Sequence, residues 1–228
     1  EQAITDKTKA ILVNSPNNPT GAVFSKETFK GIAELAIAKD LFILSDEIYE
    51  ELSFYGDFTP MATFAPEHTI TFSGFSKAFA MTGWRIGYMI APAYVNDVVR
   101  QINENVTFSA PAISQQAGIY ALKHSEELVP KVVNVFQQRL EYVKKRVDAL
   151  PFLSLGEIKG TMYAFINIEK TQLTSVAFVE KVLKETNVLM IPGKAFGHNT
   201  GDTHVRLAVT QDLEQLKEAF DRIEKLTF

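Results

Sequence analysis

Lys77 and Arg85 are the charged side chains of an otherwise small and mostly apolar stretch, GFSKAFAMTGWRIG, at residues 74–87. A protonated lysine is a poor nucleophile, so covalent chemistry on a carbonyl group requires apolar or cationic surroundings. Phe75 and Phe79 supply the first condition, and Arg85 supplies the second. A planar guanidinium also binds phosphate through two parallel hydrogen bonds. These residue types would suit a nucleophilic lysine beside an anion-binding arginine, whereas a lysine on a loop is more often a solvated surface residue.

The elements that must position these residues follow an α/β pattern in the first half of the chain. Ser25 is typical of a helix N-cap, and the helix that it opens is expected to run to about Asp40. Short apolar runs predict strands at residues 10–14, 41–46, 68–74 and 85–91. In open α/β sheets, ligands bind beyond the carboxyl ends of the strands. The loops that begin at Asn14, Asp46 and Ser73 are therefore expected to converge.

The second half of the chain changes character after residue 93. Long helical patterns are expected from there and between residues 112 and 149. Strands are predicted at residues 160–168, 188–193 and 203–210, and helices at 174–186 and from Leu213 onward. This order predicts a smaller α+β domain behind long connecting helices.

The run at residues 74–87 resembles the pyridoxal-phosphate attachment signature of the class I aminotransferases, the aspartate and aromatic aminotransferase family of fold type I. The resemblance implies that Lys77 is the catalytic lysine that holds the cofactor, and that Arg85 binds the phosphate. The element SDEIYEE resembles the family's Asp-x-x-Tyr element. It implies that Asp46 pairs with the protonated pyridine nitrogen and that Tyr49 reaches the ring hydroxyl.

Two further stretches resemble the same family. NSPNNPTG resembles its Asn-Pro-Thr-Gly loop, which implies that Asn18 donates a hydrogen bond to the pyridoxal ring hydroxyl and that the bond before Pro19 is cis. HVRLAVT, near the C-terminus, resembles the strand whose arginine binds the substrate α-carboxylate, here Arg206. One departure is Gly74, which stands where many members carry a serine that binds the phosphate. Ser73 or Ser76 is a candidate substitute, and absence of the contact is an alternative that the sequence leaves open.

The resemblance implies an α/β fold with a mostly parallel sheet and helices on both faces, followed by a smaller α+β domain. Residues 1–110 correspond to the C-terminal part of the cofactor-binding large domain, 111–148 to connecting helices, and 149–228 to the small domain. Because only the C-terminal part of the family is matched, we expect a fragment that is inactive by itself. The intact protein is expected to be a homodimer.

The implied activity is transamination between an amino acid (aspartate, aromatic or related) and a 2-oxo acid such as 2-oxoglutarate. A pyridoxal-phosphate C–S β-lyase of the same fold is an alternative, because it uses the same residues. A non-catalytic regulatory domain with an aminotransferase-like fold is a third possibility, which a DNA-binding module upstream would mark.

Composition limits the other classes of function. The 228 residues carry a formal net charge of −4 without a basic cluster, which gives no reason to expect nucleic-acid or membrane-surface binding. Cysteine is absent, so disulfides and thiolate metal sites are excluded, and a cytoplasmic location is expected. The four histidines, His68, His124, His198 and His204, lack metal-ligand spacing. No apolar run reaches the roughly 18 residues that suggest a membrane-spanning helix.

Overall fold

The computed structural model describes residues 1–56, 58–197 and 199–228. The chain divides into two compact units: Glu1–Pro16 with Val23–Val133, and Asn17–Ala22 with Asn134–Phe228. The boundary falls within helix α4 (Ser125–Ala149). The short loop that contains Asn18 therefore groups with the C-terminal residues. The assignment of residues 1–110, 111–148 and 149–228 to parts of the whole protein stays a prediction.

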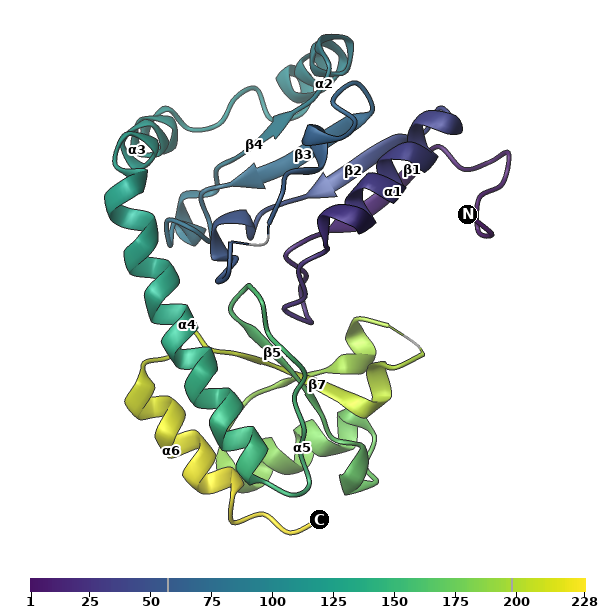
Figure 1. The fold of residues 1–228 in the computed structure, drawn as a ribbon. Helices are drawn as coiled ribbons and strands as arrows, with labels where there is room; N and C mark the ends of the chain where they lie inside the picture. The colour runs from purple at the N-terminus through teal and green to yellow at the C-terminus, as the bar shows by residue number, and fades with distance from the viewer. Residues whose placement is uncertain (57, 198) are drawn as a thin grey trace. The chain divides into compact units, whose positions relative to one another are not determined.

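The first unit contains a four-stranded sheet in the order β1-β2-β3-β4 (Figure 1). Its strands are β1 (Ala10–Asn14), β2 (Phe42–Asp46), β3 (Thr69–Gly74) and β4 (Gly87–Ile90). The first three are parallel and β4 is antiparallel to β3, which confirms the predicted mostly parallel sheet. The fourth strand is shorter than predicted because Arg85 adopts a left-handed backbone with φ 51°, which does not continue a strand.

Helix α1 (Lys26–Ala38) covers one face of this sheet. Ser25 caps it by accepting a hydrogen bond from the Thr28 amide at 3.2 Å. Phe29, Ala33 and Ala36 of the helix pack with Val13 and Ile43 of the strands in one buried cluster. Burial of this apolar surface stabilises the unit, at roughly 25 cal/mol per Å² removed from water.

The opposite face of the sheet is partly open to solvent in this chain, although Ile70 on this face is buried. Side chains alternate between the two faces along each strand, so Leu12, Asp46 and Phe72 lie on the face away from α1. Leu12 is 71% exposed and Phe72 is 39% exposed. Asp46 is consequently half-buried, whereas its neighbour Ser45 is fully buried.

The remaining helices of the first unit are α2 (Ala93–Val106) and α3 (Ala112–Lys123), with short 3-10 turns at Glu50–Leu52, Met61–Thr63 and Thr82–Trp84. Helix α3 packs closely on the segment that precedes Lys77. A Cβ added at Gly118 would lie 3.2 Å from the Phe75 ring, and Phe75 clusters with Met81 and Ala121. The helical pattern predicted between residues 112 and 149 is interrupted at His124, where α3 ends before α4 begins.

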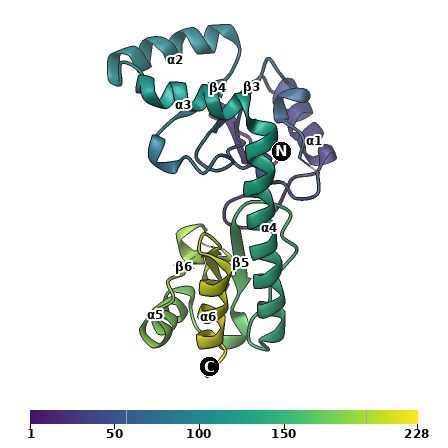
Figure 2. The same cartoon turned by 90° about the vertical axis from the view of Figure 1, so that its left-hand side faces the viewer.

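The second unit contains a three-stranded antiparallel sheet in the order β5-β7-β6. Its elements are β5 (Tyr163–Asn167), β6 (Ile191–Pro192), β7 (His204–Ala208), α5 (Ser175–Thr186) and α6 (Leu213–Ile223). Helix α6 lies beside the C-terminal part of α4 (Figure 2), where Arg146 Nη1 donates to Asp221 at 2.8 Å. This arrangement confirms the predicted α+β unit.

The strand predicted at residues 188–193 was too long. Only Ile191–Pro192 pairs with β7, so residues 188–190 lie outside the pairing, and the 3-10 turn Gly193–Ala195 begins directly after Pro192. Among the described residues, no helix has both the length and the apolar character needed to cross a membrane.

Candidate active site

The three parallel strands end side by side, as predicted. Asn14 is in register with Asp46, and its Nδ2 donates to the Asp46 carbonyl at 3.1 Å. The Ser15 amide donates to the same carbonyl at 3.2 Å, and the Glu47 amide donates to the Phe72 carbonyl at 2.9 Å. These contacts hold the loops after β1, β2 and β3 at one edge of the sheet, where ligands bind in open α/β sheets.

Lys77 lies in a turn three residues after β3 ends. Its side chain is half-buried, and its sequence neighbours Phe75 and Ala78 are 6% and 4% exposed. Its Nζ lies 5.8 Å from the centroid of the Tyr49 ring. The structure thus brings together two of the predicted site residues, and the apolar neighbours expected for a nucleophilic lysine are present.

Asp46 and Tyr49 occupy the end of β2 and the turn that follows it. Asp46 Oδ1 accepts a hydrogen bond from the Ile48 amide at 3.3 Å, and the residues that the structure describes offer no donor to Oδ2. Tyr49 is 4% exposed and precedes the 3-10 turn Glu50–Leu52. A carboxylate oxygen on the open face of the sheet is thereby available to a ligand that carries a donor.

Arg85 lies in the same unit, after the 3-10 turn Thr82–Trp84. Its side chain is exposed, and its Nη1 donates to the Thr82 carbonyl at 2.9 Å. This bond orients the guanidinium through one nitrogen only. The other N–H groups of the Arg85 guanidinium are suited to binding an anion.

Asn18 and Arg206 meet in the second unit. Arg206 Nη1 donates to Asn18 Oδ1 at 2.8 Å. The peptide bond between Asn18 and Pro19 is cis, as predicted. Arg206 Cζ lies 4.4 Å from the Tyr163 ring centroid and 4.7 Å from that of Phe196. The sequence reasoning missed these two aromatic residues, although Tyr163 stands in a predicted strand where alternation alone could have assigned its face.

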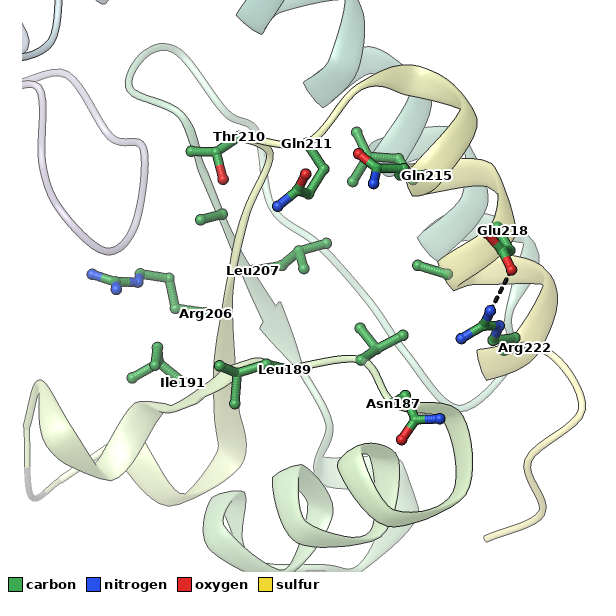
Figure 3. A pocket seen from close by; sticks show the side chains of 14 residues that line it. Asn187, Leu189, Ile191, Arg206, Leu207, Thr210, Gln211, Gln215, Glu218 and Arg222 are labelled. Atoms are coloured by element: carbon green, nitrogen blue, oxygen red, sulfur yellow. Dashed lines mark hydrogen bonds and ion pairs between the residues drawn. The ribbon is translucent and has the colours of Figure 1, made fainter. Parts of the chain in front are cut away.

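A groove of about 570 Å³ on the second unit runs between α6 and the strands β6 and β7. Figure 3 shows Arg206 and Leu207 on opposite sides of β7, with Leu207 pointing toward α6 and the Arg206 side chain pointing away from it. Arg222 and Glu218 form an ion pair on α6 at the far side of this groove. The guanidinium of Arg206 therefore belongs to the other side of the sheet, where Asn18 lies.

Glu50 organises a polar cluster that the sequence did not predict. Its Oε1 accepts hydrogen bonds from Ser73 Oγ at 2.9 Å and from the Tyr88 hydroxyl at 3.2 Å. Burial raises the pKa of Tyr88, and the nearby Glu50 carboxylate adds to this effect. Because the Ser73 hydroxyl is engaged by Glu50, Ser76 is the better candidate for the phosphate contact proposed from the sequence.

Gly74 is required by the backbone around it. A Cβ at this position would lie 2.8 Å from the Cα of Gly87 and 3.2 Å from the Ile86 carbonyl oxygen. The close pairing of β3 and β4 thus explains why a serine does not stand here.

Glu47, next to Asp46, is a buried carboxyl group that the sequence did not single out. It is 1% exposed, and its Oε1 accepts hydrogen bonds from Ser45 Oγ at 2.8 Å and the Met61 amide at 3.0 Å. Its Oε2 is buried without a hydrogen-bond partner in the described part of the chain. Desolvation raises the pKa of Glu47, against the opposing effect of these hydrogen bonds.

The described residues contain no group of three or more His, Asp and Glu side chains that could hold a metal ion. His198 lies outside the described residues. Of the other histidines, His68 contacts the Leu41 carbonyl through Nδ1 at 3.1 Å, and His204 stacks on the Phe165 ring at 4.8 Å.

Residues 1–223 match the family model described as aminotransferase class I and II. The chain is 40% identical to the aspartate aminotransferase of Pyrococcus horikoshii, over 98% of this chain and 58% of the relative. It is also 40% identical to aromatic-amino-acid aminotransferase 2 of Thermococcus litoralis, over 99% of this chain and 59% of the relative. The structure of aspartate aminotransferase from Thermus thermophilus with maleate superposes with a TM-score of 0.93 at 36% identity, covering 98% of this chain and 58% of that one.

The chain thus spans a little under three fifths of the length of these relatives. The family match covers nearly all of its own residues, and it includes the stretches that carry Lys77, Asp46, Tyr49, Arg85, Asn18 and Arg206. By sequence and by fold, this chain belongs to the class I and II aminotransferases.

Proposed function

We propose that the full-length protein catalyses pyridoxal-phosphate-dependent transamination between an amino acid and a 2-oxo acid. The observation that carries this proposal is the position of Lys77, whose Nζ lies 5.8 Å from the Tyr49 ring centroid beyond the ends of two neighbouring parallel strands. Membership of the aminotransferase family supports the same reaction.

The residues of the first unit fit the proposed cofactor by the chemistry of their groups. Lys77 offers an amine for the aldehyde, Asp46 offers an accessible carboxylate oxygen for a protonated ring nitrogen, and Arg85 offers an exposed guanidinium for the phosphate. When bound, pyridoxal phosphate supplies an electron sink for the pair of electrons that remains when the substrate Cα loses its proton.

In this proposal each side chain has a separate role. Asp46 keeps the ring nitrogen protonated through its negative charge, and Tyr49 donates to the ring hydroxyl. The Lys77 amine would act as general base and acid for the proton at the substrate Cα. The half-buried position of Lys77 limits competition from water.

Arg206 is proposed to bind the substrate, and Asn18 is proposed to bind the cofactor ring. Arg206 binds the α-carboxylate, since a guanidinium matches a carboxylate in charge and planar geometry. Its bond to Asn18 Oδ1 uses the acceptor end of the amide, so the amide nitrogen is the end that donates to the ring hydroxyl. The maleate in the Thermus thermophilus structure, a dicarboxylate, supports a carboxylate site in this fold.

The substrate proposal is an aspartate-like or aromatic amino acid with 2-oxoglutarate as acceptor, supported by the names of the relatives. A cytoplasmic homodimer is proposed for the intact protein, and residues 1–228 by themselves are proposed to be inactive. The β-lyase and the regulatory domain are less well supported, because the relatives are named as aminotransferases.

The test is borohydride reduction of the full-length protein with added pyridoxal phosphate, followed by peptide mass mapping. The pyridoxyl label is expected on Lys77 and lost in Lys77→Arg. The matched control is Lys30→Arg, an exposed lysine of α1, which should label like the wild type. Glutamate formed from 2-oxoglutarate then supports transamination, whereas pyruvate formed from cystathionine would identify the lyase. A label on another lysine would reject the assignment of Lys77.

A further inference from the structure

The guanidinium of Arg206 lies over two aromatic rings. Its Cζ lies over the Tyr163 ring at 4.4 Å and over the Phe196 ring at 4.7 Å, both within the roughly 6 Å at which a ring face attracts a cation. Nη1 donates to Asn18, whereas Nε is buried and has no hydrogen-bond partner within residues 1–56, 58–197 and 199–228. Protein contacts thus restrain the guanidinium plane without using all of its N–H groups.

The two rings are supported in different ways. Tyr163 is 8% exposed and stands on β5, two residues before Phe165, which is in register with Arg206 on β7. Phe196 is 37% exposed and follows the 3-10 turn Gly193–Ala195. Its ring meets Phe165 edge-on at 6.3 Å. One ring is therefore fixed in the interior, and the other shields the guanidinium from solvent.

We propose that Tyr163 and Phe196 are positioning residues for carboxylate recognition, holding the Arg206 guanidinium in one plane so that its N–H groups meet both oxygens of a substrate carboxylate. The proposal rests on the proposed function, in which Arg206 binds that carboxylate. Arginine has many rotamers, and ordering such a side chain during binding weakens affinity. A guanidinium already ordered by two rings avoids this cost, and partial exclusion of water strengthens the charged hydrogen bonds.

Two variants, Phe196→Leu and Phe196→Trp, distinguish an effect of the aromatic ring face from an effect of side-chain size alone. Leucine keeps an apolar side chain but removes the ring, and tryptophan restores a ring face for the cation. The matched control is Phe228→Leu in the same unit. Phe228 is 42% exposed and lies 5.7 Å from Lys181 Nζ, so this variant also removes a partly exposed ring from a cation, at a site distinct from Arg206.

The measurement is calorimetric titration of the full-length protein with succinate, a non-reactive dicarboxylate, together with steady-state kinetics for aspartate and 2-oxoglutarate. Phe196→Leu is expected to weaken succinate binding about tenfold and to raise KM by a similar factor, with kcat changed less than about twofold. Phe196→Trp should recover most of the affinity, and Phe228→Leu should match the wild type. A ring that merely stabilised the fold would lower the unfolding temperature without this split between KM and kcat.

The outcomes separate the two proposals. Unchanged succinate affinity in Phe196→Leu, or failure of Phe196→Trp to recover it, would overturn the positioning role while leaving transamination intact. A wild type that binds succinate in a ring-dependent manner but forms no glutamate from 2-oxoglutarate would retain the positioning role and reject the proposed function. A wild type that does not bind succinate at all would overturn the positioning role.

Discussion

Arg206 donates from Nη1 to Oδ1 of Asn18 at 2.8 Å, although 188 positions separate the two residues in the sequence. The loop Asn17–Ala22 packs with the C-terminal unit, so the contact lies within one compact body. It joins a residue predicted to face the cofactor ring to a residue predicted to face the substrate.

Replacing Asn18 by alanine should weaken substrate binding. The change removes the acceptor that orients Arg206, and a hydrogen bond to a charged group contributes about 1.5–3 kcal/mol, which corresponds to roughly tenfold or more in KM. Steady-state kinetics of the full-length protein with both substrates would measure it. Asn134→Ala, on the exposed side of α4, is the control. Wild-type KM values in Asn18→Ala would contradict a role for the amide in orienting Arg206.

Glu47→Gln should make stability less dependent on pH. Because burial raises the pKa of Glu47, the folded protein binds this proton more tightly than the unfolded chain, whose value lies near 4.5. Stability from the neutral form is complete below that value and is lost as pH rises through the folded pKa. Glutamine does not ionise and keeps an acceptor oxygen. The variant should therefore be more stable than the wild type in mildly alkaline buffer, with a difference that shrinks toward pH 4.5.

Thermal unfolding at several pH values would measure this difference, and Glu34→Gln on the exposed face of α1 is the control. Glu47→Leu should instead lower the stability of the protein. It leaves the Ser45 hydroxyl and the Met61 amide without an acceptor, at a cost of about 1–3 kcal/mol for each buried group. A parallel pH dependence in wild type and Glu47→Gln would show that the carboxyl group does not titrate as argued.

Gly74→Ser should destabilise the first unit rather than restore a phosphate contact. The new Cβ would lie 2.8 Å from the Cα of Gly87, so strands β3 and β4 would have to separate. We expect a loss of about 1–3 kcal/mol in unfolding free energy, typical of overpacking. Denaturant titration would measure it. Gly31→Ser, where an added Cβ meets no atom within 4 Å, should change little. Equal stability of Gly74→Ser and wild type would refute the steric explanation.

Gly193→Ala should disrupt the turn that presents Phe196. An added Cβ would lie 2.4 Å from the carbonyl oxygens of Gly201 and His204, both of which are backbone atoms that cannot rotate away. The expected cost is about 3 kcal/mol or more, with weaker binding of succinate. Gly156→Ala in the same unit, which has open space around the new methyl group, is the control for both measurements. Unaltered succinate affinity together with unaltered stability would contradict the steric explanation for Gly193.

Local patterns were sufficient for most of the secondary structure. The apolar run before Asn14 and the run before Asp46 predicted parallel strands, because buried strands read as continuous apolar segments. Ser25 correctly marked the start of α1. The strand predicted at residues 188–193 was too long because residues 188–190 lie outside the pairing with β7, and that pairing depends on the neighbouring strand rather than on local composition.

The sequence by itself determined the family, the α/β order of the elements and the motif residues such as Lys77 and Asp46, since these are encoded by residue type and short spacing. Only the tertiary structure decided which distant side chains meet. Three contacts depend on strand register and on how the elements pack. They are the Tyr163 and Phe196 rings over Arg206, the hydrogen bond from the Ser73 hydroxyl to Glu50, and the close approach of Gly74 to Gly87. Those contacts join segments far apart in the chain, so their geometry is set by how whole elements pack and cannot be read from neighbouring residues.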